Sequence, residues 1–327
     1  MTIALASPIV IPFPARPATL GFKHVLSAAA FGSDALRSLF DVASAWKARP
    51  GVYAGALAGR TVVLLFEKPS LRTRLSFEIG ASKLGAHVVY MDISKQRIGE
   101  RESPEDYASN LSLWADAVVT RTYAHHTVEA MARASSVPVI NGLSERHHPC
   151  QALADLLTMK ERFGDLRGLK IAYVGDGNNV CDSLLIAGAT VGADLMVICP
   201  PGYDPSPEAV RIASQRARAS GAEIMITDEM EALHNRQVVY TDTWVSMGQD
   251  EEAAARQAVF APYQINARAM SLAAPDAVFM HCLPAHRGHE VTDEVLDGPQ
   301  SIALQQADNR LHAQNALLLH LLADPNA

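Results

Sequence analysis

Two arginines and a serine stand close together where a predicted helix begins, in the segment Ser70-Leu71-Arg72-Thr73-Arg74. Ser70 is a favourable N-cap residue, so the backbone N–H groups after it should point outward without partners inside the helix. The positive end of the helix dipole lies behind them, and Arg72 and Arg74 add guanidinium groups suited to phosphate or carboxylate oxygens. The segment therefore predicts an anion site, although a capped helix with two solvated arginines explains this segment alone equally well.

A histidine and a glutamine lie one turn apart in residues 148–151, His-Pro-Cys-Gln, where another helix is predicted to begin. The imidazole of His148 and the amide of Gln151 could both donate hydrogen bonds to a carbonyl oxygen. A helix-capping histidine is one alternative, and a zinc site is another. The candidate zinc ligands are His147, His148, Cys150, His281 and Cys282. Because their spacing matches no common zinc motif, we expect no metal.

A carboxylate, a hydroxyl and a glycine turn occur together in residues 242–248, Asp-Thr-Trp-Val-Ser-Met-Gly. Asp242 could bind an amino group, while Ser246 and nearby backbone N–H groups could bind a carboxylate. The alternatives are an ordinary side-chain cap at Asp242 or Ser246 and core packing for Met247. The segment is thus a candidate site for an amino acid substrate.

Short apolar strands alternating with helical segments must position these side chains, and this pattern is typical of parallel α/β sheets. The predicted strands are residues 61–66, 87–91, 117–120, 137–140, 170–174, 195–199, 223–226, 238–241 and 277–280. Ligands bind beyond the carboxyl ends of the strands in such sheets. The polar groups that follow strands are 70–74, Arg121, Asp176 with Asn179, Asp242, and His281 with Cys282. We therefore expect them to gather at one edge.

The composition favours a globular chain of two domains. The chain has 327 residues, 49% of them hydrophobic, and a formal net charge of −7. No apolar run is long enough to span a membrane, and the acidic balance argues against nucleic-acid binding. Four cysteines are too few for a disulfide framework, which favours a reducing cytoplasm. The first 22 residues contain four prolines and no early basic residue, unlike a signal peptide.

The Gly175-Asp176-Gly177 turn after the strand 170–174 invites a dinucleotide-binding interpretation. The third glycine of that motif is missing at the required spacing, and the strand 195–199 has no acidic residue at its end to bind a ribose. We therefore expect no cofactor, and an NAD-dependent dehydrogenase stays a weaker alternative.

Taken together, seven segments resemble the aspartate/ornithine carbamoyltransferase family. They are FEKPSLRTR (66–74), RT (121–122), HPCQ (148–151), GDGNN (175–179), DTWVSMG (242–248), HCLPAHRG (281–288) and DNRLHAQNALLL (308–319). They span nearly the whole chain after residue 60, and DTWVSMG with HCLP points to ornithine rather than aspartate. The resemblance implies carbamoyl transfer from carbamoyl phosphate to the δ-amine of L-ornithine, giving citrulline for arginine biosynthesis.

The resemblance also implies an α/β fold of two doubly wound parallel-sheet domains around a central cleft. Residues 1–150 would bind carbamoyl phosphate and residues 151–307 would bind ornithine, with a C-terminal helix at 308–327 packing back on the first domain. The implied assembly is a cytoplasmic homotrimer in which the polar loop 92–105 completes the site of a neighbouring subunit. No membrane or nucleic-acid partner is expected.

Residue roles follow from the same resemblance. The expected carbamoyl-phosphate ligands are Ser70, Leu71, Arg72, Thr73, Arg97, Arg121, His148, Gln151, Cys282, Leu283 and Arg310. The expected ornithine ligands are Asn179, Asp242, Ser246 and Met247. The residues expected to act in catalysis are Arg121, His148, Asp242 and Cys282.

The chain departs from the family pattern at two positions. Leu71 replaces a threonine of the usual STRTR cradle, and Arg97 stands where the loop usually supplies a glutamine. These departures predict a form of the enzyme that tolerates phosphate-mimicking inhibitors. If a bisubstrate phosphonate inhibits this chain and a standard family member equally, the hypothesis is contradicted. A carbamoyltransferase for another amine, such as putrescine or acetylornithine, and a non-catalytic homologue remain as alternatives.

Overall fold

Residues 21–245 and 250–323 are described in the computed structural model, and they build two separate parallel sheets. The first sheet contains β1 (Thr61–Phe66), β2 (His87–Asp92), β3 (Ala117–Arg121) and β4 (Val139–Leu143), in the order β2-β1-β3-β4. The inner strands β1 and β3 are buried almost throughout, as expected for apolar runs covered on both faces. The helices of this half are α1 (Ser33–Ala48), α2 (Leu71–Lys83), α3 (Pro104–Leu111) and α4 (His125–Ala134).

The second sheet follows the same plan with one more strand. It contains β5 (Lys170–Val174), β6 (Asp194–Ile198), β7 (Ile224–Thr227), β8 (Val238–Thr241) and β9 (Val278–His281), in the order β7-β6-β5-β8-β9. Its helices are α6 (Asn179–Val191), α7 (Pro207–Ser220), α8 (Ala253–Phe260), α9 (Ala267–Leu272) and α10 (Asp293–Leu296). Every predicted strand is present. The bounds differ most from the prediction at β4, which was predicted at residues 137–140 and lies at Val139–Leu143. The predicted fold class is confirmed.

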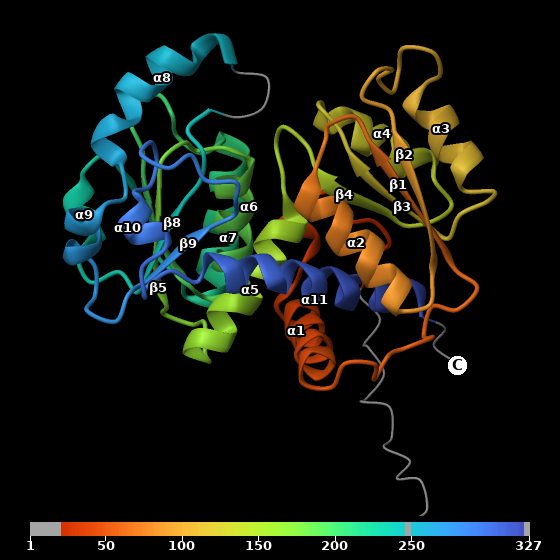
Figure 1. Cartoon of the computed structure of the whole chain (residues 1–327), viewed down its shortest axis with the longest axis horizontal. Coiled ribbons are helices and arrows are strands. Elements are labelled where there is room, and N and C mark those ends of the chain that lie inside the picture. Colours follow the sequence, from red (N-terminus) through yellow and green to blue (C-terminus); the bar gives the residue numbers. More distant parts are fainter. Residues whose placement is uncertain (1–20, 246–249, 324–327) are drawn as a thin grey trace, which may run out of the picture.

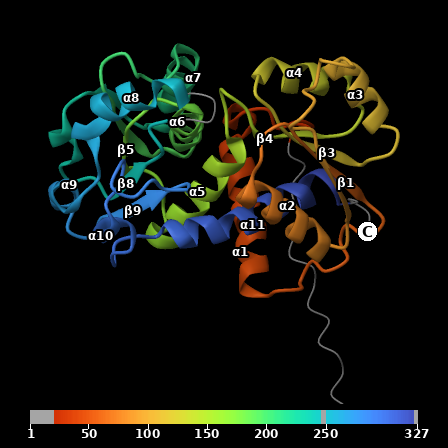
Figure 2. The ribbon, with the colours of Figure 1, turned by 45° about the horizontal axis from the view of Figure 1, so that its top comes forward.

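Two long helices join the halves, α5 (Pro149–Phe163) and α11 (Ala303–Leu322), and both run between the sheets in Figures 1 and 2. α5 begins where the sequence predicts a helix, because Pro149 suits a first turn, and Gly164 ends the helix at a φ of 79°. α11 begins five residues before the predicted 308 and packs on α1, α2 and α5, so the expected return to the first half is confirmed. Neither α11 nor any other described helix is long and apolar enough to cross a bilayer.

The packing of α2 leaves two of its large apolar side chains in solvent. Leu75 and Ile79 are 41% and 46% exposed, while Phe77 is fully buried. The reason is the close approach of α11, since a Cβ added at Gly80 would lie 2.0 Å from Asn315 Oδ1. Gly80 therefore has no room for a side chain where α11 approaches, and Leu71, Leu75 and Ile79 form an exposed stripe on another face of α2.

Candidate active site

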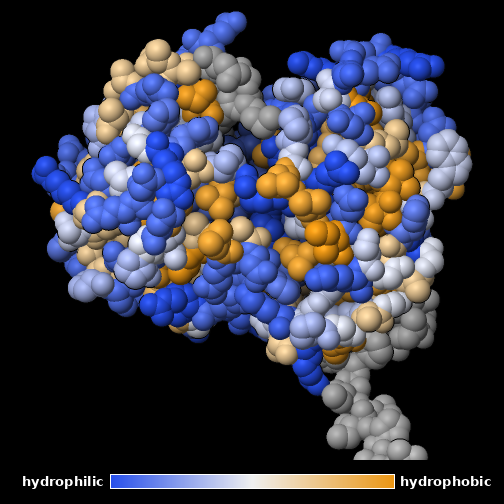
Figure 3. Space-filling view, viewed as in Figure 1, coloured by the Kyte–Doolittle hydropathy of each residue, from blue (hydrophilic) through white to orange (hydrophobic). Residues whose placement is uncertain are grey.

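The predicted site residues come from both halves of the molecule. They follow β1, β3, β5, β8 and β9, which all run parallel within their sheets. Within each sheet their carboxyl ends therefore share one edge, and Figure 3 shows hydrophilic side chains within the hollow between the halves. The expectation that these residues gather is met by the contacts described below.

The start of α2 contains the predicted anion site. We call it the cradle, and it comprises Ser70, Leu71, Arg72 and Thr73. The Ser70 hydroxyl caps the helix by accepting a hydrogen bond from the Thr73 N–H, at 3.2 Å. Arg121, at the end of β3, donates to the Ser70 hydroxyl over 3.3 Å. Leu71, in the first turn, is 67% exposed, so at this position the cradle can offer only backbone N–H to an anion. The Ser70 hydroxyl thus links the start of α2 to the end of β3.

Arg310 of α11 ties the C-terminal helix into this cradle although it is only 2% exposed. Its guanidinium donates to Thr73 Oγ1 at 3.1 Å, to Gln151 Oε1 at 2.5 Å and to Gln314 Oε1 at 2.9 Å. All three acceptors are neutral, so the positive charge is held in place without being cancelled. The return of α11 therefore delivers a cation to the site.

Three guanidinium groups, on Arg72, Arg121 and Arg310, repel one another at the cradle. Burial, followed by repulsion from Arg310 and Arg72, lowers the pKa of Arg121 to about 10. Arg121 nevertheless remains protonated at neutral pH. An anion bound between these groups would relieve the repulsion, so the site is arranged to receive negative charge.

His148 lies beside the three arginines as a neutral imidazole. Its ring is buried, and its backbone N–H donates to Ser183 Oγ at 2.8 Å. Burial, together with the charges of Arg310, Arg121 and Arg72, holds the pKa of His148 well below its usual value. A neutral imidazole keeps one N–H that can donate to a carbonyl oxygen, as the sequence predicted.

A buried carboxyl group, Asp155, fixes the amide of Gln151. Gln151 Nε2 donates to Asp155 Oδ1 at 2.8 Å, and Gln306 Nε2 donates to the same oxygen at 2.7 Å. The Tyr240 hydroxyl donates to Asp155 Oδ2 at 3.2 Å. Burial raises the pKa of Asp155 to about 7 despite these bonds. Sequence reasoning missed Asp155, although its position one turn after Gln151 on α5 is a signal that could have found it.

The second half contributes a carboxylate and a thiol in contact. Cys282 Sγ donates to Asp242 Oδ1 at 2.8 Å, and Asn178 Nδ2 donates to Asp242 Oδ2 at 2.9 Å. Burial, then the nearby Asp242, raises the pKa of Cys282 well above its usual value, so the group is a thiol. Sequence reasoning also missed Asn178, whose place as N-cap of α6 could have indicated it. Asn179 donates to the Ser144 carbonyl at 2.6 Å and so reaches the first half.

The remaining predicted ornithine ligands, Ser246 and Met247, lie outside the described residues. Leu283 has a positive φ of 58°, which is uncommon for a residue with a branched side chain and marks a backbone constraint beside Cys282. Its N–H donates to His281 Nδ1 at 2.9 Å, and His281 Nε2 lies 3.1 Å from Glu290 Oε1. Both ring nitrogens of His281 are therefore engaged in holding this turn.

The metal-binding side chains that lie together are not the full set of zinc candidates named from the sequence. In the described part of the chain, one group has ligand atoms within 4.8 Å of one another, namely Asp242, His281 and Cys282. The histidine of this group is already bonded through both nitrogens, and the cysteine is a thiol hydrogen-bonded to the carboxylate. The geometry is therefore explained by contacts within the protein.

Arg97 lies against its own chain rather than in the cradle. Its guanidinium carbon is 4.2 Å from the centroid of the Tyr123 ring, which also packs on Lys68 at 4.3 Å. The buried Glu67 accepts from the N–H groups of Ile98 and Tyr123, each at 2.8 Å, and so fixes the loop. Among the described residues the Arg97 side chain makes no hydrogen bond to Ser70 or Thr73. Its contact with a neighbouring subunit's phosphate stays a prediction.

The loop before His148 makes stability depend on pH. His147 is buried against His125, with ring centroids 4.8 Å apart, and burial, followed by the charges of His125 and Arg146, lowers the pKa of His147 to about 3. Between pH 6.5 and about 3 the unfolded chain binds a proton that the folded chain rejects. The free energy of unfolding should therefore fall as pH falls, by up to about 1.4 kcal/mol per pH unit from this group.

We expect the variant His147→Gln to lose this part of the acid sensitivity, as measured by urea unfolding at several pH values between 4 and 7. The exposed His126, on α4, supplies the control variant His126→Gln, whose slope against pH should match that of the parent. A slope in His147→Gln equal to that of the parent would show that His147 does not titrate in this way.

Comparison with known proteins agrees with this geometry. Two parallel-sheet α/β domains with a cationic cradle are suited to binding an anionic substrate. Residues 23–161 match the family model for the aspartate/ornithine carbamoyltransferase carbamoyl-P binding domain, and residues 167–321 match the Asp/Orn binding domain. The chain therefore belongs to the aspartate/ornithine carbamoyltransferase family.

Individual relatives are similar over nearly their whole length. The ornithine carbamoyltransferase of Shewanella oneidensis is 50% identical over 301 residues, covering 92% of this chain and 100% of the relative. The solved ornithine carbamoyltransferase from Pyrococcus furiosus is 42% identical, with a TM-score of 0.89 over 92% of this chain and 97% of that one. A solved N-acetyl-L-ornithine transcarbamylase is 30% identical, with a TM-score of 0.84 over 92% and 100%.

Proposed function

We propose that the chain transfers the carbamoyl group of carbamoyl phosphate to the δ-amine of L-ornithine, giving L-citrulline and phosphate for arginine biosynthesis. The observation that carries this proposal is the junction of Ser70, Arg121, Thr73 and Arg310 through direct hydrogen bonds at the start of α2. A cationic cradle at a helix N-terminus suits a phosphate group. The names of relatives about 50% identical to this chain support ornithine as the acceptor.

In the proposed reaction the amine lone pair attacks the carbamoyl carbon and a C–N bond forms. Negative charge develops on the carbonyl oxygen, where His148, Thr73 and Arg121 would donate hydrogen bonds. Gln151, held by Asp155, would orient the carbamoyl group. The carbon–oxygen bond to phosphate then breaks, and the leaving phosphate retains the electron pair within the arginine cradle. The proton lost by the amine passes to the departing phosphate or to solvent.

The acceptor amine must be neutral to attack, yet an unperturbed alkyl amine has a pKa near ~10.4 and is mostly protonated at neutral pH. The three cradle arginines disfavour a further positive charge nearby, so they would help the δ-amine to lose its proton. Asp242 and Cys282, which contact each other, would orient the amino acid together with Asn179, Ser246 and Met247. Leu283 would contribute its backbone beside the carbamoyl group.

A parallel citrulline assay with L-ornithine, putrescine and acetylornithine tests the proposal. We expect L-ornithine to be carbamoylated at least about tenfold faster than either alternative, because Asp242 supplies a carboxylate for an α-amino group that putrescine lacks and acetylornithine blocks. If acetylornithine is carbamoylated as fast as L-ornithine or faster, acetylornithine would be the preferred acceptor. No turnover of any amine would favour a non-catalytic homologue.

The exposed stripe on α2 supports a homotrimer whose subunits share sites. Leu71, Leu75 and Ile79 recur every four residues on one face of α2 and are 67%, 41% and 46% exposed. A neighbouring subunit seated there would bury this stripe and bring its own loop 92–105, with Arg97, towards the cradle. We propose that the first domain ends at residue 150 and the second begins at residue 151. We also propose a cytoplasmic location, because all four cysteines are free, namely Cys150, Cys181, Cys199 and Cys282.

Light scattering should give a mass about three times the 35.2 kDa of one chain. The double variant Leu75→Glu/Ile79→Glu should dissociate the assembly, because burying two carboxylates without partners is costly. Met225 on β7 is 54% exposed and supplies the matched control Met225→Glu, which should leave the mass unchanged. A monomeric parent, or a trimeric double variant, would remove this surface from the proposed interface.

A further inference from the structure

A cavity separate from the cradle lies at the amino edge of the second sheet. It has a volume of about 530 Å³ and is lined by residues of α1, α5, α6 and α7 and by residues 164–167. Residues 164–167, Val191 and Ser220 all precede strands, namely β5, β6 and β7. The active-site residues instead follow their strands, so the cavity belongs to the opposite edge. We call it the α1–α7 groove.

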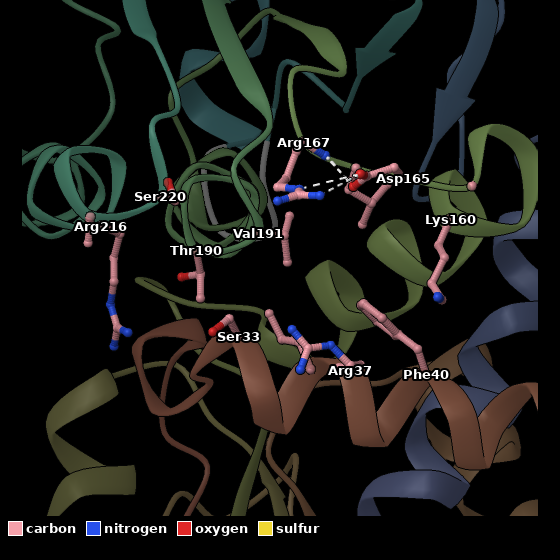
Figure 4. Close-up of a pocket in the computed structure, with 14 residues that line it drawn as sticks. Ser33, Arg37, Phe40, Lys160, Asp165, Arg167, Thr190, Val191, Arg216 and Ser220 are labelled. Atoms are coloured by element: carbon pink, nitrogen blue, oxygen red, sulfur yellow. Dashed lines mark hydrogen bonds and ion pairs between the residues drawn. The ribbon is translucent and has the colours of Figure 1, made fainter.

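Four cationic side chains line the α1–α7 groove, namely Arg37, Lys160, Arg167 and Arg216, against one carboxylate, Asp165. Figure 4 shows Arg37 below Arg167, with Lys160 and Arg216 towards opposite ends. The cavity is therefore bounded by positive charge along its length.

Two of these cations lack a neutralising partner. Arg167 is paired with Asp165 at 3.1 Å, and Arg37 is paired with Asp34 at 3.0 Å. Arg216 donates to the Ala29 carbonyl at 3.0 Å but contacts no carboxylate among the described residues. The Lys160 ammonium has no hydrogen-bond or ion-pair partner in that part of the chain either. The groove thus carries an excess of two positive charges.

We propose that the α1–α7 groove binds a small polyanion with two or more phosphate or carboxylate groups. The volume is within the range of about 300–1,000 Å³ that small-molecule sites occupy. A ligand with separated anionic groups could reach both Lys160 and Arg216, whereas one inorganic ion could contact only one end. Because α1 belongs to the first half and α7 to the second, the bound anion bridges the two halves of the chain.

Calorimetric titration with pyrophosphate tests the site independently of carbamoyl transfer. The titrations use the background Arg72→Ala, which weakens pyrophosphate binding at the cradle. We expect the added changes Lys160→Ser and Arg216→Ser to weaken the remaining binding by about tenfold or more. The control change Arg211→Ser, at an exposed position of the same helix α7, should leave it within about twofold of the background.

Circular dichroism and thermal unfolding establish that each variant folds. A parallel titration with citrate distinguishes carboxylate from phosphate ligands, and binding of either probe that depends on Lys160 and Arg216 supports the site. Equal binding with and without these two side chains would overturn the proposal, as would the absence of binding by both probes in the Arg72→Ala background.

Discussion

Replacing Arg72 by alanine should lower the rate of citrulline formation by at least about 10²–10³-fold, the usual cost of removing one donor that stabilises developing charge. The side chain of Arg72 faces the cradle, where burial lowers its pKa and the nearby Cys282 and Asp242 oppose that change. Its guanidinium forms no hydrogen bond with the described residues. The free energy of unfolding should therefore change by less than about 0.5 kcal/mol.

Arg74 is the matched control, because it lies two residues further along α2 and points away from the cradle. Its guanidinium bonds Glu78 at 3.0 Å and packs 3.7 Å from the Tyr90 ring centroid. The variant Arg74→Ala should keep a rate within a few-fold of the parent when both are measured at saturating substrate concentrations. A near-normal rate in Arg72→Ala, or an equal loss in both variants, would remove the cradle from the mechanism.

Replacing Asp155 by leucine should reduce the free energy of unfolding by about 3–5 kcal/mol, a large change for a single residue. The leucine would leave Gln151, Gln306 and Tyr240 without the oxygens that they now contact. Each buried polar group without a partner costs about 1–3 kcal/mol. Citrulline formation should fall as well, because Gln151 would lose the bond that orients its amide.

The variant Asp155→Asn distinguishes the effect of the carboxylate charge on stability from the effect of its hydrogen bonds. Burial raises the pKa of Asp155 to about 7, so the native carboxyl is partly neutral at that pH and an amide of the same shape changes little. The asparagine variant should lose only about 1 kcal/mol in urea unfolding at pH 7. A leucine variant as stable as the asparagine variant would show that the network does not depend on this residue.

Much of the fold could be predicted because its signals are local. The strands β1, β5 and β8 have the predicted bounds, since continuous apolar runs between polar segments need no distant information. The Ser70 cap was likewise confirmed, because capping depends on residues within one turn. The parallel arrangement then placed the polar groups after the strands at shared edges.

The rest depended on contacts between segments distant in the chain. The buried face of α2 could not be predicted from the sequence, because it depends on the approach of α11 at Gly80. Arg310 and Asp155 owe their roles to partners up to 237 residues away, and Asn178 reaches Asp242 across 64 residues. The sequence by itself determined the strands, the caps and the residue types available for chemistry. Tertiary packing decided which of them meet, because hydrogen bonds and burial depend on positions in space rather than on spacing along the chain.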